Sequence, residues 1–199
     1  MQEIISLGVY RYKNYTAAVN SSTEEALLMD FANILKAGGS TTVVVPEIQR
    51  IKFFKNFWNL TFATVATLTQ HPLTAIFRLP TSSPETVELP SVKYASRIIE
   101  NTIPTLHAIM NEIHTIGDAL GFPRDPTGID PSKVEELFNN TMRLHSMPDS
   151  KHRPSMLVDL EKGRPMEVEV IVGEVVRVAR ECGVHIPVSW CASCPEINI

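Results

Sequence analysis

The segment from residue 47 to residue 71 has no proline or glycine between Pro46 and Pro72, and it limits the fold more than any other feature. Proline suits the first position of a helix, so Pro46 predicts the start of a long one. The apolar residues of this segment recur at spacings of three and four, which indicates a helix with one buried face. They are Ile48, Ile51, Phe54, Trp58, Phe62 and Val65.

Helical spacing continues through most of the chain. Ser22 or Thr23 can cap a helix that ends at Gly38-Gly39. Further helices are predicted at residues 91–101, 105–122, 133–145 and 167–182, the third of them after an Asp130-Pro131 cap. Only the opening residues 4–13 alternate like a strand. The pattern predicts a mainly α fold with a short N-terminal strand.

The composition excludes several classes of protein. The 199 residues are 44% hydrophobic, and they carry a formal net charge of -4 without a basic stripe, so nucleic acid is not an expected partner. The apolar runs are shorter than a membrane span of about 20 residues, and the N-terminus lacks the basic start of a signal peptide. Three cysteines do not make a disulfide framework. We expect a cytoplasmic protein that is not embedded in a membrane.

Two polar residues of the long helix could carry chemistry. Lys55 and Asn59 are four residues apart, so an ammonium and an amide project from the same face beside aromatic residues. A lysine in that position could donate a proton if burial lowered its pKa. Spacing alone equally describes a surface lysine whose stem covers apolar neighbours.

A second polar cluster lies near the end of the chain. Ser155 and Asp159 share a helical face, and Gly163-Arg164-Pro165 interrupts the helix before Glu167 begins the next one. Such an interruption can direct two helix ends at one pocket. The residues also allow a structural reading, in which Glu167 stabilises a helix N-terminus and Asp159 pairs with Arg164 or a backbone amide.

These motifs resemble those of the ketopantoate reductases (2-dehydropantoate 2-reductases). The string KHRPSMLVDLEKGRPMEVEVIVGEVVRVARECGVHIPV is similar to the family pattern of a serine-methionine start, an aspartate, Gly-Arg-Pro and a glutamate. The string EIQRIKFFKNFWNLTFATVATLT is similar to the family's helix in which asparagine follows lysine by four residues. The resemblance covers about residues 22 to 188. It implies a helical C-terminal domain of the ketopantoate reductase or 6-phosphogluconate dehydrogenase type.

The resemblance also implies an activity and residue roles. NADPH would reduce 2-dehydropantoate to pantoate, a step of pantothenate biosynthesis. Lys55 would donate the proton to the keto oxygen and Glu167 would hold the substrate hydroxyl, as the catalytic pair. Asn59 and Ser155 would bind polar groups of the substrate.

The sequence departs from the family in its nucleotide-binding half. No glycines have the G-x-G-x-x-G spacing of a dinucleotide site, so no cofactor-binding residue is expected in this chain. We expect residues 1–20 to be the remnant of a nucleotide-binding domain and residues 21–199 to be the substrate-binding domain. The chain would then be a fragment with little activity of its own.

Other departures leave alternatives open. Ala63 and His152 stand where other members of the family can have asparagine, which allows a reductase of another branched 2-keto acid. A second alternative is a non-catalytic module that forms homodimers or regulates a partner. Cys191-x-x-Cys194 has no second ligand pair, and His107 and His114 have no third ligand, so no metal site is expected.

Overall fold

The computed structural model describes residues 4–11, 13–15, 19–78 and 97–187. Its first elements are β1 (Ile4–Leu7), α1 (Ser22–Ala37), β2 (Thr41–Val44), α2 (Ile48–Trp58), η1 (Asn59–Ala63), α3 (Thr64–Thr69) and α4 (Thr74–Phe77). The remaining elements are η2 (Ile98–Thr102), α6 (Ile103–Ala119), α7 (Pro131–Ser146), α8 (Ser155–Glu161), η3 (Glu169–Gly173) and α9 (Glu174–Glu181). The mainly α prediction is confirmed. None of the helices in these residues is both long and apolar enough to cross a membrane.

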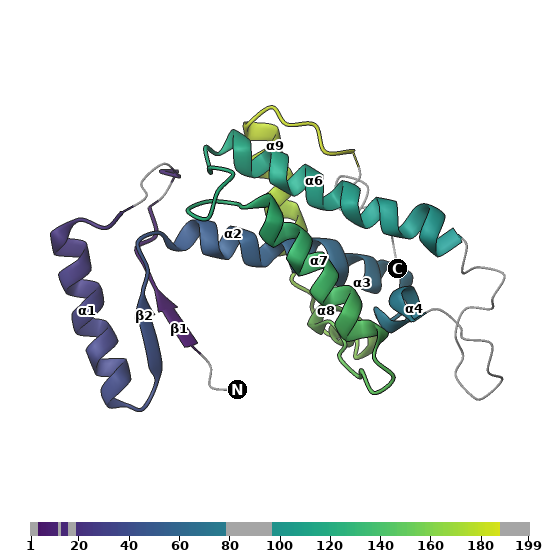
Figure 1. The fold of residues 1–199 in the computed structure, drawn as a ribbon, viewed down its shortest axis with the longest axis horizontal. Coiled ribbons are helices and arrows are strands. Elements are labelled where there is room, and N and C mark those ends of the chain that lie inside the picture. Colours follow the sequence, from purple (N-terminus) through teal and green to yellow (C-terminus); the bar gives the residue numbers. More distant parts are fainter. Residues whose placement is uncertain (1–3, 12, 16–18, 79–96, 188–199) are drawn as a thin grey trace.

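A small βαβ unit lies at one end of the molecule, apart from the helical body (Figure 1). Strands β1 and β2 are parallel, with Ile4 opposite Thr41 and Leu7 opposite Val44. Helix α1 connects the two strands and packs on β2. The sequence predicted only the first strand, because the β-branched run that forms β2 is four residues long. The domain boundary after residue 20 remains a prediction, although α1 packs with the strands.

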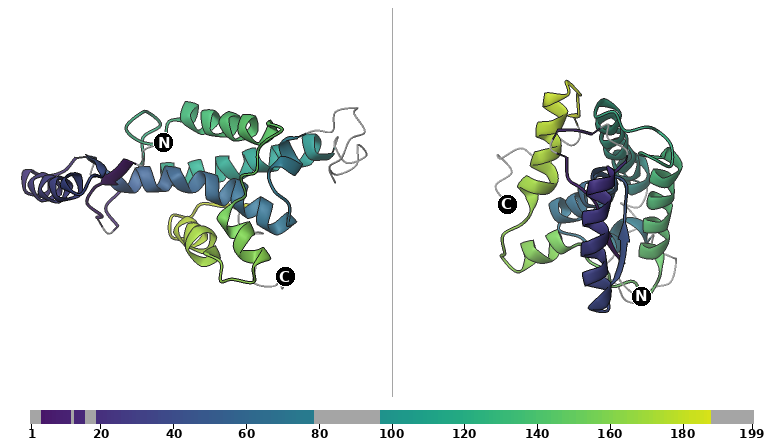
Figure 2. Two further views of the ribbon diagram at one scale, coloured as in Figure 1. Left: turned by 90° about the horizontal axis from the view of Figure 1, so that it is seen from below. Right: turned by 90° about the vertical axis from the view of Figure 1, so that its left-hand side faces the viewer.

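The helical body is built around the α2–η1–α3 helix, which is continuous from Ile48 to Thr69. Helix α6 runs alongside it, α7 lies on one side of this pair, and α8 and α9 lie on the other (Figure 2). The core contains Phe57, Leu60 and Phe62 from the central helix, each at most 1% exposed. The predicted buried face is wrong at Ile51, which is 44% exposed although Ile48 in the same turn is only 7% exposed.

Two predicted helix starts are displaced along the chain. The N-cap of α1 is Ser21, not Ser22 or Thr23, because its hydroxyl accepts from the Glu24 amide while the Glu24 carboxylate accepts from the Ser21 amide. Helix α2 begins at Ile48 rather than Pro46, because the Glu47 carboxylate accepts from the amides of Gln49 and Arg50 in the first turn of the helix. In both cases a side-chain cap determines the start of the helix.

The N-terminal cap of α1 predicts that the stability of the protein depends on pH. The Ser21 amide and the Arg11 guanidinium both donate to Glu24, and they lower its pKa from 4.5 to about 2. A carboxylate with a depressed pKa stabilises the folded state above the unfolded pKa, and this stabilisation is lost as pH falls from 4.5 towards 2. Glu24→Gln is therefore expected to lower the free energy of unfolding at pH 6, with the difference disappearing near pH 2. Urea denaturation across this range measures it.

The matched control for this experiment is Glu25→Gln. Glu25 is the exposed neighbour of Glu24 in the same helical turn. Its side chain makes no hydrogen bond or ion pair within the described part of the chain. Its substitution is expected to leave the pH dependence unchanged, and an equal effect of both substitutions would contradict a specific role for the Ser21–Glu24 cap.

Candidate functional site

Lys55 and Asn59 lie on the central helix, and both line one cavity of about 790 Å³. Lys55 is in the last turn of α2, and its side chain is exposed. Asn59 is half-buried and begins the π-helical segment η1. The spacing of four residues therefore places the ammonium and the amide at the same cavity, as the sequence predicted.

The π-helical segment η1 begins at Asn59. The Asn59 carbonyl accepts from the Thr64 amide five residues later, and the Thr64 hydroxyl donates to the same carbonyl at 3.3 Å. Leu60, Phe62 and Ala63 in this segment are buried in the core. A π-helical turn inserts one residue into a helix and often marks a functional site. Here the core holds the widened turn while Asn59 reaches the cavity.

Glu167 reaches the same cavity from the other side. Its carbonyl accepts from the Ile171 amide at 2.9 Å, so Glu167 immediately precedes the helix that continues through η3 into α9. Gly163, with φ of +61°, ends the preceding helix α8 and allows the chain to turn. The Asn56 amide donates to the Ile171 carbonyl at 3.2 Å, which joins α2 to η3. The structure thus brings Lys55, Asn59 and Glu167 together.

Ser155 is not among the residues that line this cavity. It is the first residue of α8, follows the buried Pro154, and is exposed. Helix α8 packs on α3 and η1, so Ser155 belongs to an element that contacts the π-helical turn. The backbone of Asp159 has a structural role, because its carbonyl accepts a hydrogen bond from the Arg164 amide at 2.8 Å.

The sequence analysis missed several residues of the cavity. Lys52 and Asn56 also line it, one turn before Lys55 and Asn59. The repeated spacing of lysine and asparagine along one helical face was the signal that could have revealed them. Tyr15 lines the cavity as well, and its pKa is raised, first by burial and then by the negative charge that Tyr10 can acquire. No pattern in the sequence connects Tyr15 to α2.

The cavity combines an apolar wall with opposite charges. Tyr15 packs edge-on against Phe122, and Phe53 packs on the same ring at 5.3 Å between centroids. Within the described residues, neither Lys55 nor Glu167 forms an ion pair, whereas Glu174 in the same cavity pairs with Arg177. Lys55 and Glu167 are thus a cation and an anion available to a polar ligand, and aromatic rings limit water on one side.

The histidines noted in the sequence have structural surroundings. His107 stacks on Phe138 with 4.0 Å between ring centroids. His114 is buried, and its Nδ1 lies 3.7 Å from Asp118. Among the described residues, no three His, Cys, Asp or Glu side chains are placed to hold a metal ion. Cys191 and Cys194 lie outside the described residues.

Comparison with known proteins gives a family match for the C-terminal half of the chain. Residues 93–190 match the family model described as the ketopantoate reductase PanE/ApbA C terminal. This range includes Ser155 and Glu167, whereas Lys55 and Asn59 precede it. A 2-dehydropantoate 2-reductase of Mesorhizobium japonicum is 35% identical over 82 residues, which are 41% of this chain and 22% of that protein.

Solved structures extend the similarity to nearly the whole chain. The 2-dehydropantoate 2-reductase of Methylococcus capsulatus is 25% identical with a TM-score of 0.63, and the match covers 94% of this chain and 47% of that one. A D-mandelate dehydrogenase, solved with NADH and anilino(oxo)acetate, shares the fold at 18% identity and a TM-score of 0.64, over 97% of this chain and 64% of that one. The chain thus spans about half of the solved 2-dehydropantoate 2-reductase.

Proposed function

This chain carries a C-terminal domain of the ketopantoate reductase family, and from that premise we propose that it supplies the substrate-binding and proton-donating half of a reductase. The proposed reaction is the NADPH-dependent reduction of 2-dehydropantoate to pantoate in the cytoplasm, as part of pantothenate biosynthesis. The observation that carries the proposal is the convergence of Lys55, Asn59 and Glu167 on one cavity.

Each of these residues has a distinct role in the proposed reaction. When bound, the cofactor would supply a hydride to the keto carbon of the substrate. This addition leaves negative charge on the keto oxygen. The Lys55 ammonium stabilises that charge and donates the proton that completes the hydroxyl. Asn59 donates a hydrogen bond to a polar group of the substrate, and the Glu167 carboxylate accepts one from the substrate hydroxyl. Ser155 is proposed to contact the substrate from the start of α8.

In this proposal, the phosphate-binding part of the dinucleotide site lies outside the described residues. Gly8 follows β1, the place where a phosphate-binding turn could begin, but it serves packing instead. A Cβ at Gly8 would lie 2.6 Å from the Ile48 Cβ, so glycine is needed there for the contact with α2. We therefore assign the cofactor to a nucleotide-binding domain outside the described residues.

The βαβ unit offers a surface for such a domain. Parallel sheets are normally covered on both faces, and two strands are too few for an independent sheet. Apolar side chains nevertheless remain exposed on both strands, with Ile4 64% and Val43 47% exposed. Further strands and helices of a nucleotide-binding domain would bury these side chains. This arrangement supports a reductase that is completed at the βαβ unit.

The proposal is tested by titrating pantoate and 2-dehydropantoate into the protein in a calorimeter. Glu167→Gln is expected to weaken binding about 10- to 100-fold, because a hydrogen bond to a charged group contributes about 1.5–3 kcal/mol. Glu169→Gln is the matched control, since Glu169 is two residues away and pairs with Arg177 outside the cavity lining. Equal affinities of the Glu167→Gln variant and the unmodified chain would contradict the assigned role of Glu167.

A non-catalytic dimerising module is the second candidate. Leu27, Phe31 and Ile34 form a stripe along α1, and each is at least 52% exposed. Two copies of the chain could bury this stripe against each other. Sedimentation velocity, together with the binding measurements above, distinguishes the two candidates. The module would be favoured over the reductase if the protein forms a dimer that the Phe31→Glu substitution dissociates, and if the protein binds no 2-keto acid.

A further inference from the structure

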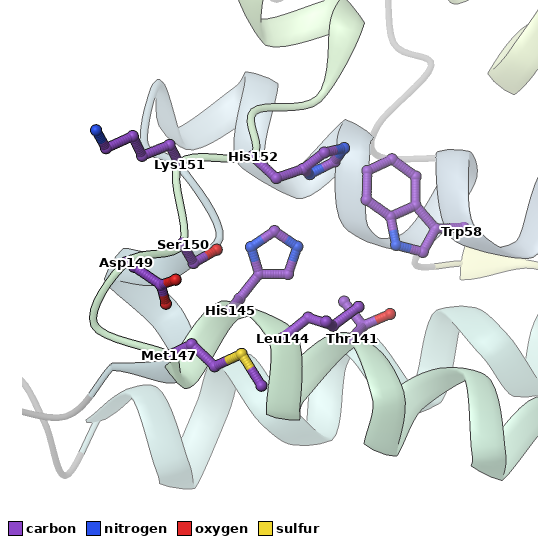
Figure 3. A pocket seen from close by; sticks show the side chains of 9 residues that line it. All are labelled: Trp58, Thr141, Leu144, His145, Met147, Asp149, Ser150, Lys151 and His152. Carbon is purple, nitrogen blue, oxygen red and sulfur yellow. The ribbon is translucent and has the colours of Figure 1, made fainter. Parts of the chain in front are cut away.

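A second cavity, of about 470 Å³, lies between the central helix and the end of α7. Its residues come from the last turn of α2, the end of α7 and the loop that leads to α8 (Figure 3). They are Trp58, Thr141, Leu144, His145, Met147, Asp149, Ser150, Lys151 and His152. The function proposed above uses none of them.

Aromatic rings form the walls of this cavity. The indole of Trp58 and the imidazole of His152 pack edge to face with 5.4 Å between centroids. The His145 ring lies 5.3 Å from the His152 ring, also at a steep angle. Thr141 and His145 are each only 3% exposed and form the floor, whereas Leu144 and Met147 stand exposed at the rim. Aromatic rings and a thioether favour an aromatic ligand.

His145 carries an unsatisfied polar atom at this floor. Its Nδ1 is buried and has no hydrogen-bond partner among the residues that the structure describes. Buried polar atoms in proteins almost always have a partner, so this one favours a ligand that supplies it. Burial and the nearby charge of His152 lower the pKa of His145, which keeps the ring neutral near pH 7. A neutral imidazole suits a hydroxyl group better than a carboxylate.

Trp58 connects this cavity to the helix that carries Lys55 and Asn59. At about 100° per residue, Trp58 is turned about 60° from Lys55 around α2, on the opposite side from Asn59. Around the helix, Lys55 therefore lies between Trp58 of the second cavity and Asn59 of the first. On the loop side, His152 is three residues before Ser155. A keto acid whose reacting carbonyl meets Lys55 could place its side chain in the second cavity.

We propose that the cavity of Trp58, His145 and His152 binds the side chain of aromatic 2-keto acids that bear a ring hydroxyl. The ring lies against Trp58 and His152, and the hydroxyl bonds to the unsatisfied Nδ1 of His145. This inference rests on the proposed reductase function, and it adds a substrate class to that same site.

Binding of paired probes tests the inference with the full chain. The probes are 4-hydroxyphenylpyruvate, phenylpyruvate and the aliphatic 3-methyl-2-oxobutanoate, and the readout is Trp58 fluorescence in a Trp190→Phe background. We expect 4-hydroxyphenylpyruvate to bind about tenfold more tightly than phenylpyruvate, which corresponds to one additional hydrogen bond. His145→Phe should abolish that difference without changing the affinity for 3-methyl-2-oxobutanoate.

Two controls keep the result interpretable. His107→Phe makes the same substitution at a histidine outside the cavity and should preserve the preference. The comparison of two probes on the unmodified chain needs no variant to fold. Equal affinities for the two aromatic probes, or a preference that survives His145→Phe, would overturn the inference. Failure of every 2-keto acid to bind would contradict the reductase function itself.

Discussion

Lys55→Ala is expected to lower kcat about 10²- to 10⁴-fold in a reductase assembled from this chain, with a much smaller change in KM. The assembly is a fusion to the half of the Methylococcus capsulatus reductase that this chain does not match. The reason is that Lys55 lines the cavity with no ion pair to another described residue, so its ammonium is available to the developing alkoxide. The rate of NADPH oxidation under saturating substrate measures the effect.

Lys52→Ala is the matched control for this prediction. Lys52 lines the same cavity one turn earlier, so its removal changes the local charge by the same amount. It is expected to raise KM with little effect on kcat, because it lies farther from Asn59 along the helix. Equal losses of kcat in the two variants would show that overall positive charge matters and would remove the specific role of Lys55.

Phe62→Ala is expected to lower the free energy of unfolding by about 3–5 kcal/mol. Phe62 is fully buried, and its ring centroid lies 5.8 Å from that of Phe138 and 6.1 Å from that of Phe77. Truncation therefore leaves a cavity where the central helix, α4 and α7 meet. Since domains have a total stability of about 5–15 kcal/mol, this single change could unfold much of the protein at 37 °C. Urea denaturation followed by circular dichroism measures it.

Ile51→Ala is the control for the stability prediction. Ile51 belongs to the same apolar repeat in the sequence, yet it is 44% exposed. Its truncation is expected to lower the free energy of unfolding by less than about 1 kcal/mol, because the exposed Ile51 side chain buries little apolar surface. A loss comparable to that of Phe62→Ala would mean that Ile51 is buried in solution.

The helices could be predicted because their signals are local. The Asp130-Pro131 cap of α7 is confirmed, with the Asp130 carboxylate accepting from the Ser132 amide, and Gly39 ends α1 with φ of +90°. Pairing of β1 with β2 could not be predicted, since it depends on contacts between residues 37 positions apart. The π-helical turns were also missed, because periodicity cannot distinguish one inserted residue from a regular helix.

The candidate site was predicted in part for the same reason. Lys55 and Asn59 line the same cavity because a helix places residues four apart on one face, which spacing alone reveals. The approach of Glu167 to this pair depends on the contact between α2 and η3, so the sequence offered it only through the family resemblance. The cavity at His145 depends on the packing of three segments, and no motif indicated it.

The most direct test of the central claim is NADPH-dependent reduction of 2-dehydropantoate by the fusion protein. NADPH oxidation followed at 340 nm should accompany pantoate formation, and Lys55→Ala should nearly abolish both. Binding of NADPH by the fusion, followed by its fluorescence, confirms that the cofactor domain is intact. A folded fusion that binds NADPH and reduces neither 2-dehydropantoate nor another 2-keto acid would contradict the account.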